Sequence, residues 1–247
     1  MLIKTNCIKW ERLYKMKKVI VALLIASNLM LLSCDNNSIN HNITNSSNKQ
    51  QEAIKEESNI VQEELSKLAN ANTIKITTDV VSMNSGHTVY IDDEEFGTIK
   101  GKYVNVTGDK FTFKSKDGTV LASEKQIKRW NVKLNRMVEV YDFEGNVVGY
   151  IGEEKIKDMF KYGYVFHFYD KDKNEIGYTN KQFISLMDTY KIYNMSDELC
   201  YKVKENFNLI QDSYDIEVIN SNDVPAEQAV FFTAIVNAIR NADSKKK

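Results

Sequence analysis

The sequence predicts a mostly β fold of the α+β class, in which serial antiparallel hairpins enclose a hydrophobic C-terminal helix. Two observations support this fold class: segments of alternating β-forming residues recur along the chain, and one segment near the C-terminus is apolar on every side. Composition agrees. The 247 residues are 43% hydrophobic and 27% charged, with 10 Gly and one Pro, which indicates one folded domain with appendages and excludes disordered, fibrous and polytopic membrane chains.

The hairpins recur at intervals of 24 to 28 residues. Their first strands are predicted at 111–115, 138–142, 166–170, 190–194 and 214–218. A short polar turn follows each of the first four, and three of the returning strands share a Gly-Tyr or Cys-Tyr pair, at 149–150, 177–178 and 200–201. An earlier copy is indicated at 96–99. Two strands in each unit, without a leucine-rich signature, favour closed or sandwiched β-structure over a solenoid.

The last element is a predicted helix over 224–240, with Asp223 as the N-cap and Pro225 in the first turn. A helix that is apolar all round is buried on every side or lies in a membrane, and about 16 residues is short for a span. We therefore expect the helix to thread a barrel. The residues expected in its buried faces are Phe231, Phe232, Ile235 and Val236. Those expected to point inward from the strands are Phe111, Phe113, Val138, Val140, Ile192 and Ile216.

A family resemblance rests on the order of these parts. The aromatic-x-aliphatic-x-Asp strand, the turn, the Gly-Tyr pair, the segment 183–187 leading into 190–193, and the hydrophobic C-terminal helix resemble the LURP-one-related branch of the tubby C-terminal-like superfamily, which includes the phospholipid scramblases. The resemblance covers 77–242 and implies a barrel of about 12 strands around a central C-terminal helix. Phosphoinositide binding is not carried over, because no basic pocket sequence matches.

The N-terminal sequence predicts where in the cell the protein is located. Lys17 and Lys18 precede the uncharged stretch 19–32, and the motif Leu31-Leu32-Ser33-Cys34 ends it. This arrangement resembles a bacterial lipoprotein precursor, with residues 1–33 as the signal peptide, Leu31, Leu32, Ser33 and Cys34 as the lipobox, and Cys34 as the lipid attachment site. The true start is Met1 or Met16. An ordinary secretory signal and a membrane-anchoring helix are the alternatives.

Between the signal and the barrel we expect two connecting segments. Residues 34–51 are rich in Asn and Ser and are predicted to be a polar linker. Ile54, Val61, Leu65 and Leu68 have helical spacing, which predicts an amphipathic helix or spacer over 52–73 that packs on the domain or stands free; a coiled coil is the less favoured alternative. The barrel domain is then expected over 74–247.

Charge and motif searches exclude several function classes. Without residues 1–33 the chain has 27 basic and 33 acidic residues, so its acidic body argues against nucleic acid and against simple electrostatic adhesion to anionic lipid. Once the signal is removed and Cys34 is lipidated, Cys200 is the only cysteine left, and its apolar surroundings indicate a packed residue. His167 is expected to be structural. The turn at 170–174 opens like a calcium loop but lacks the required Gly and Glu, which indicates a charged hairpin turn.

No catalytic residue, metal site or cofactor is therefore predicted. The expected function is a non-enzymatic binding or structural domain, anchored by lipid to the bacterial cell membrane on its extracytoplasmic side, with a lipid, a peptide or an envelope protein as partner. The first alternative is phospholipid handling of the scramblase type. The second is a hydrolase with its site in the loops.

Overall fold

The computed structural model describes residues 40–78, 86–102, 110–158, 161–180, 182–183, 189–206 and 212–244. The lipobox residues Leu31, Leu32, Ser33 and Cys34 lie outside these ranges. The chain divides into two compact units, Met1–Glu57 and Ser58–Lys247. The described part of the first unit is helical and belongs to α2 (Asn40–Ala69). The second unit holds the end of α2, the strands and the C-terminal helix α3 (Ala226–Ser244).

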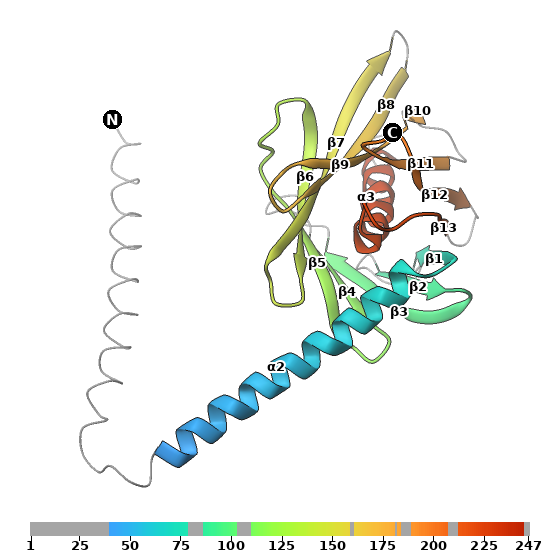
Figure 1. The fold of residues 1–247 in the computed structure, drawn as a ribbon. Coiled ribbons are helices and arrows are strands. Elements are labelled where there is room, and N and C mark those ends of the chain that lie inside the picture. The colour runs from blue at the N-terminus through green and yellow to red at the C-terminus, as the bar shows by residue number, and fades with distance from the viewer. Residues whose placement is uncertain are drawn as a thin grey trace, which may run out of the picture. The chain divides into compact units, whose positions relative to one another are not determined.

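Thirteen strands are present among the described residues. They are β1 (Thr73–Thr78), β2 (Gly86–Ile91), β3 (Glu94–Lys102), β4 (Lys110–Ser115), β5 (Val120–Gln126), β6 (Leu134–Asp142), β7 (Val147–Asp158), β8 (Lys161–Asp170), β9 (Glu175–Thr179), β10 (Gln182–Phe183), β11 (Thr189–Asn194), β12 (Leu199–Asn206) and β13 (Ser213–Val218). Figure 1 shows them arranged around α3.

The strands form a closed antiparallel barrel. Each of β1 to β8 pairs with its neighbour in sequence, β1 pairs with β13, and β13, β12, β11 and β9 follow in that order. The pairing of β8 with β9 closes a ring of twelve described strands, and the two-residue β10 pairs farther along β8. At the junction of the two chain ends of the domain, Ile74 lies opposite Ile216. The prediction of a mostly β, antiparallel barrel of about 12 strands is confirmed.

Four hairpin turns share one hydrogen-bonding pattern, which confirms the predicted repeat. In each turn the amide of the first residue donates to the carbonyl four positions on, and the fourth residue donates back to the first. The fourth residue has positive φ in every copy, at Gly118, Gly145, Lys173 and Asp197. Glycine reaches this left-handed region without strain, while lysine and aspartate are held there by the closed turn.

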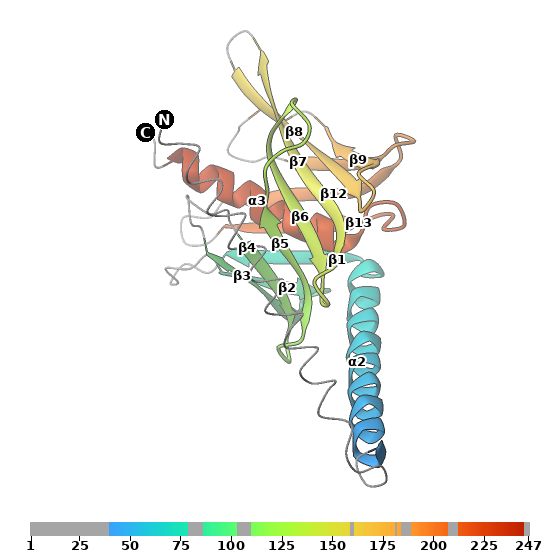
Figure 2. The ribbon, with the colours of Figure 1, turned by 90° about the vertical axis from the view of Figure 1, so that its left-hand side faces the viewer.

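The helix α3 fills the barrel, and Figures 1 and 2 show strands on its several sides. The Phe232 ring meets Phe166, Phe168 and Tyr190 edge to face, with centroids 4.9, 5.9 and 5.3 Å away. Phe231 makes the same kind of contact with Phe113 across the interior. The six strand residues expected to point inward are all buried, so the inward pattern was predicted correctly.

Two of the repeated Gly-Tyr positions lie where α3 and the segment leading into it approach the strands most closely. A Cβ placed on Gly149 would lie 2.2 Å from the side-chain nitrogen of Gln228 on α3, and one placed on Gly177 would lie 2.6 Å from a methyl group of Val224. These approaches explain why glycine recurs there. In the third copy, Cys200 is small enough to be fully buried.

The helices differ from the sequence expectation at their ends. The helix α2 begins at Asn40 rather than at residue 52, so residues 40–51, expected in the polar linker, are helical. No Gly or Pro interrupts this polar stretch, so a helix anchored by packing farther along extends through it. It ends at Ala69, because Thr73 already belongs to β1. The helix α3 runs from Ala226 to Ser244 rather than over 224–240.

The unit Ser58–Lys247 contains a complete core. The buried apolar residues of the described chain begin at Val61 and end at Val236. Val61 and Leu68, two positions of the predicted apolar stripe of α2, are buried in the same cluster as the barrel interior, whereas Ile54 is exposed. A fragment that starts at residue 40 therefore retains all the buried apolar residues of the described chain, while one that starts at β1 loses Val61, Leu68 and Ala71.

Candidate functional site

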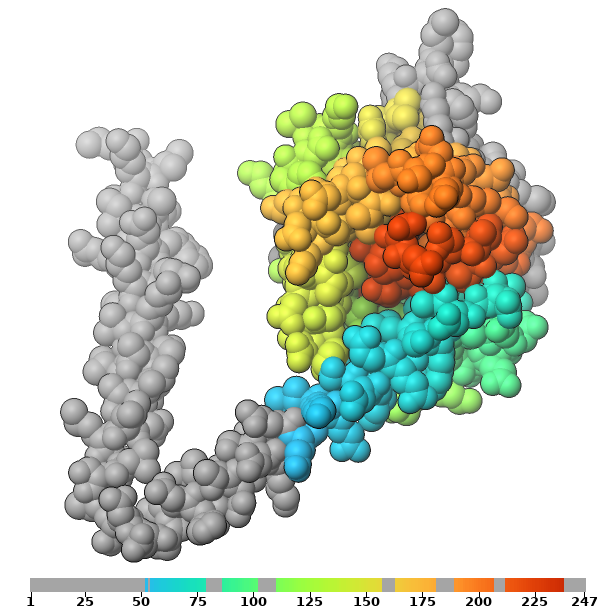
Figure 3. Space-filling view, in the orientation of Figure 1, coloured from blue at the N-terminus to red at the C-terminus, as the bar shows by residue number. Residues whose placement is uncertain are grey.

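A groove of about 550 Å³ lies within the unit Ser58–Lys247. It lies between the last turns of α2, the β6–β7 hairpin, β5 and the first turn of α3. In Figure 3 the cyan turns of α2, the yellow-green β6–β7 region and the red segment before α3 come together on the face toward the viewer. Its apolar lining includes Val61, Leu65, Leu121, Ala122, Phe143 and Val148. Grooves of this size and character are the usual place for ligands.

Packing and one hydrogen bond fix the α2 wall of the groove. Val61 and Leu68 point into the core, one helical turn apart from Leu65, which is half-buried at the groove. The hydroxyl of Ser221 donates to the carbonyl oxygen of Ala69 at 2.8 Å, so the end of α2 is tied to the segment that precedes α3. This wall is consequently positioned by the same residues that position α3.

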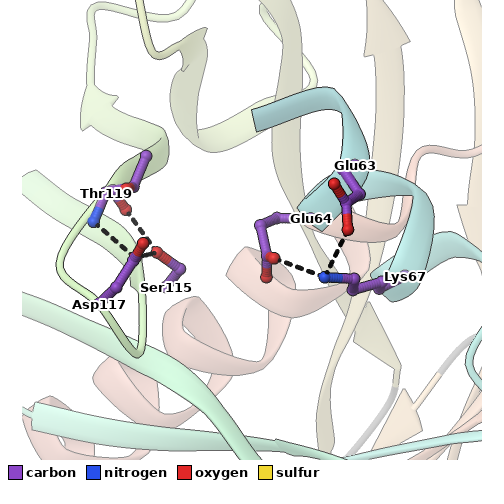
Figure 4. Close-up of polar contacts among 6 residues, drawn as sticks. All are labelled: Glu63, Glu64, Lys67, Ser115, Asp117 and Thr119. Atoms are coloured by element: carbon purple, nitrogen blue, oxygen red, sulfur yellow. Dashed lines mark hydrogen bonds and ion pairs between the residues drawn. The ribbon is translucent and has the colours of Figure 1, made fainter. Parts of the chain in front are cut away.

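Lys67 pairs with two carboxylates on the surface of α2. The ammonium of Lys67 lies 3.0 Å from a carboxylate oxygen of Glu63 and 2.8 Å from one of Glu64, as Figure 4 shows. The hydrogen bond with Glu64 raises the pKa of Lys67. Lys67 is not among the residues that line the groove.

Figure 4 also shows the β4–β5 turn. There Asp117 accepts hydrogen bonds from the Ser115 hydroxyl and from the Thr119 amide, and the Ser115 bond lowers the pKa of Asp117. The Asp117 carboxylate therefore stabilises the β4–β5 turn to which it belongs.

Glu227 is the chemically distinctive residue of the groove. It stands in the first turn of α3 and lines the groove together with Asp142 and Glu144, and the described lining includes no Lys, Arg or His. Asp142 accepts two hydrogen bonds from Asn146 and Glu144 accepts one, so both serve the β6–β7 turn. No other described side chain donates to the Glu227 carboxyl, and burial raises the pKa of Glu227.

Tyr201 supports the start of α3 from inside the barrel. Its hydroxyl donates to the carbonyl oxygen of Val224 at 2.6 Å, and both residues are fully buried. Burial, with the nearby Glu227 charge as the second cause, raises the pKa of Tyr201 far above its ordinary value, so the phenol stays a donor. The groove thus has an apolar floor, an anionic end, and a backbone held by a permanent hydrogen bond. An apolar group that carries a cation or a hydrogen-bond donor would complement such a surface.

The other residues singled out by the sequence belong to strands of the barrel. Cys200 is free and fully buried, and burial raises the pKa of its thiol, which confirms the packed interpretation. His167 lies on the outer face between carboxylates of neighbouring strands, with Nδ1 2.7 Å from Glu175 and Nε2 3.1 Å from Glu154. Asp170 accepts hydrogen bonds from Asp172 and Asn174, as expected for a hairpin turn.

Phe231, Phe232 and Val236 lie in the barrel interior, whereas Ile235 is only half-buried, so the expectation of complete burial is wrong for Ile235.

Membrane-spanning helices and metal-binding clusters are both absent from the described residues. No helix there is long and apolar enough to cross a membrane. Nowhere in that part of the chain do three or more His, Cys, Asp or Glu side chains converge as metal ligands would. Comparisons with family models, with curated proteins and with solved structures give no match. The groove therefore has to be interpreted from its own chemistry.

Sequence reasoning did not find Glu227. One signal was available: it is the only acidic residue in the first half of a helix that is otherwise apolar all round. Its significance depends on Val61 and Ala122, which come from distant parts of the chain and meet it only in the fold.

Proposed function

We propose that this chain is a lipid-anchored, non-enzymatic binding protein, and that its groove takes up a peptide segment with an apolar stretch and a cationic side chain. The observation that carries this proposal is the Glu227 carboxyl, which lies without a side-chain donor at the end of an apolar groove. A desolvated carboxylate gains more from a cation or strong donor than an exposed one does, so such a ligand satisfies the groove best.

The filled barrel supports a binding function at the surface. Phe231 and Phe232 occupy the interior, and both are fully buried. No substrate could enter without displacing α3, which leaves grooves and loops as the working surfaces. Nothing in the groove resembles an acid-base pair or a nucleophile with a base, so we do not extend the proposal to hydrolysis.

We also propose kinship with the LURP-one-related branch of the tubby C-terminal-like superfamily. A twelve-strand antiparallel ring around a C-terminal helix is the arrangement that this resemblance implies. Fold kinship does not transfer function, so the scramblase alternative gains nothing from it.

The lipid anchor has its own test. Cys34→Ser should abolish metabolic labelling of the protein with a radioactive fatty acid and leave an unprocessed or released form, because only a thiol at that position can accept the diacylglycerol group. Cys200→Ser is the matched control, since Cys200 is buried and should not be lipidated. Labelling that persists in Cys34→Ser would refute the anchor without affecting the groove.

The groove is tested with the fragment 40–247 and short fluorescent peptides, read by fluorescence anisotropy. A Leu/Lys peptide should bind, while Leu/Glu and Ser/Lys peptides of the same length should not. In the proposal, binding requires both an apolar group and a cationic group. Glu227→Gln should weaken binding of the Leu/Lys peptide about tenfold, as expected for a charge-assisted hydrogen bond. Gln62→Trp should also weaken it, because Gln62 lines the groove from the exposed side of α2.

The control is Glu94→Gln, which removes the same charge from the exposed end of β3 and should leave binding unchanged. Equal binding of the Leu/Lys and Ser/Lys peptides would show that the acidic surface alone attracts them. That result, or binding that neither Glu227→Gln nor Gln62→Trp weakens, would overturn the groove proposal.

A further inference from the structure

The connection between β5 and β6 concentrates positive charge in an otherwise acidic protein. From residue 125 to 138 the chain has five basic residues and no acidic one, whereas the chain that follows residue 33 has more acids than bases. Lys128, Arg129 and Lys133 all belong to the loop itself and are exposed. Lys173, in the β8–β9 turn, adds another ammonium beside it, 5.7 Å from the Trp130 ring centroid.

Hydrogen bonds hold this loop in one shape. The Arg129 guanidinium donates through Nη1 to the carbonyl oxygen of Leu134 at 2.7 Å, which bridges the two ends of the loop. At the tip, the Lys133 amide donates to the Asn131 side chain at 3.0 Å, and the Leu134 amide donates to the Asn131 carbonyl at 3.2 Å. The loop therefore presents its side chains in a fixed arrangement, and binding would not require ordering it.

The same loop exposes apolar side chains beside its cations. The Trp130 ring stands edge-on to Tyr150 and Tyr169, with centroids 6.2 and 5.1 Å away, above a small outer-face cluster that includes Leu134 and Met137. Even so, Trp130 remains 39% exposed, and Val132 at the tip is 89% exposed. Packing on the cluster explains why part of the Trp130 ring is buried. It does not explain why an apolar side chain, Val132, stands exposed at the tip.

We propose that the loop 128–133 is a docking surface for an anionic phospholipid membrane, with Trp130 and Val132 entering the headgroup region and Lys128, Arg129, Lys133 and Lys173 facing the lipid phosphates. Tryptophan beside basic residues is typical of membrane-binding surfaces. The amphipathic ring lies at the level of the lipid headgroups, and the cations are attracted to the anionic lipids. An acidic protein surface would pair with the cations. It would offer no apolar environment to Val132, which is 89% exposed at the tip.

The net negative charge of the chain after residue 33 does not contradict this inference. Charges act over about 8 to 10 Å at physiological salt, so a membrane in contact with the loop is affected by the local cations more than by acids on distant strands. The inference does not depend on the groove. It is also independent of the lipid anchor, since a fragment without the N-terminus keeps the loop.

The fragment 40–247 offers a direct readout, because Trp130 is its only tryptophan. Its fluorescence should shift to shorter wavelength with vesicles that contain phosphatidylglycerol and phosphatidylcholine, and should be quenched by brominated acyl chains. Vesicles of phosphatidylcholine alone should have little effect. Each cation near an anionic surface changes partitioning roughly fivefold, so Lys128→Gln with Lys133→Gln should weaken vesicle flotation on the order of 20-fold.

Two further variants separate the contributions. Val132→Asp should also weaken flotation, because it places a carboxylate at the tip that would enter the headgroup layer. Lys191→Gln with Lys204→Gln is the matched control; it removes the same charge from exposed positions on β11 and β12 and should leave flotation unchanged. Circular dichroism should show that every variant keeps its fold, since all of these side chains are exposed.

Absence of the fluorescence shift with anionic vesicles at low salt would overturn the proposal. So would an equal loss in the loop variant and in the control variant, which would indicate attraction by overall charge. If a polyglutamate peptide shifts the fluorescence while anionic vesicles do not, the surface serves an acidic protein partner instead of a membrane.

Discussion

Truncating Phe232 to alanine should remove most of the stability of the domain. Phe232 is fully buried on α3 and is in edge contact with three rings from β8 and β11, the nearest with its centroid 4.9 Å away. Burial of a phenylalanine makes its loss cost about 3 to 5 kcal/mol, and the three lost ring contacts place Phe232→Ala at the upper end of that range. Against a domain stability of about 5 to 15 kcal/mol, the variant should be marginally folded at 37 °C.

Urea denaturation of the fragment 40–247, followed by circular dichroism, measures this effect. Phe232→Leu should cost only about 1 to 2 kcal/mol because it keeps much of the volume. Val132→Ala is the surface control and should stay within about 0.5 kcal/mol of the parent. A fragment that ends before α3 should show no cooperative transition. Equal stability of Phe232→Ala and Val132→Ala, or a normal transition without α3, would refute the filled-barrel account of the core.

Three other predictions concern single groups. Burial raises the pKa of Glu227, so the folded state keeps this proton after the unfolded state has released it; the contribution of Glu227 to stability should be greatest below the unfolded pKa of about 4.3 and should fall as the pH rises toward the folded pKa. Glu227→Gln should abolish that fall in pH-dependent melts, and a parallel decline in both proteins would contradict it. His167→Ala should lower stability by about 1 kcal/mol in urea denaturation, because carboxylates on the two neighbouring strands lose the hydrogen-bonding ring between them. Tyr201→Phe should cost about 1 to 2 kcal/mol by calorimetry, since a buried carbonyl loses its donor at 2.6 Å; an unchanged melting temperature would show that water replaces it.

The barrel could be predicted because its signals are local. Alternating residues such as Phe111 and Phe113 define a strand, and a turn such as that at Gly118 ends it. The eight residues 111–118 contain both signals. The start of α2 could not be predicted in the same way, because the Asn- and Ser-rich sequence has weak helix propensity. That stretch is helical because Val61 and Leu68 fix the helix farther along the chain, which is a tertiary effect.

The site was hidden for a different reason. Glu227 belongs to a helix whose sequence predicts only burial, and an acid near a helix start is ordinarily explained by the helix dipole. Burial raises its pKa, and the groove that it lines also takes Leu65 and Phe143 from distant parts of the chain. The loop at Trp130 was missed because the overall acidity of the chain was averaged over residues that lie far from it.

The placement of α3 has a consequence for when this chain can fold. In chain order α3 follows the thirteen described strands that surround it, and β1, which pairs early with β2, gains its second partner only in β13, the last of these strands. Early hairpins can form, but they have no interior to close around and no way to complete the ring. A stable domain therefore cannot form until β13 and α3 are both available. The long-range contacts that close the ring also make it slow to form.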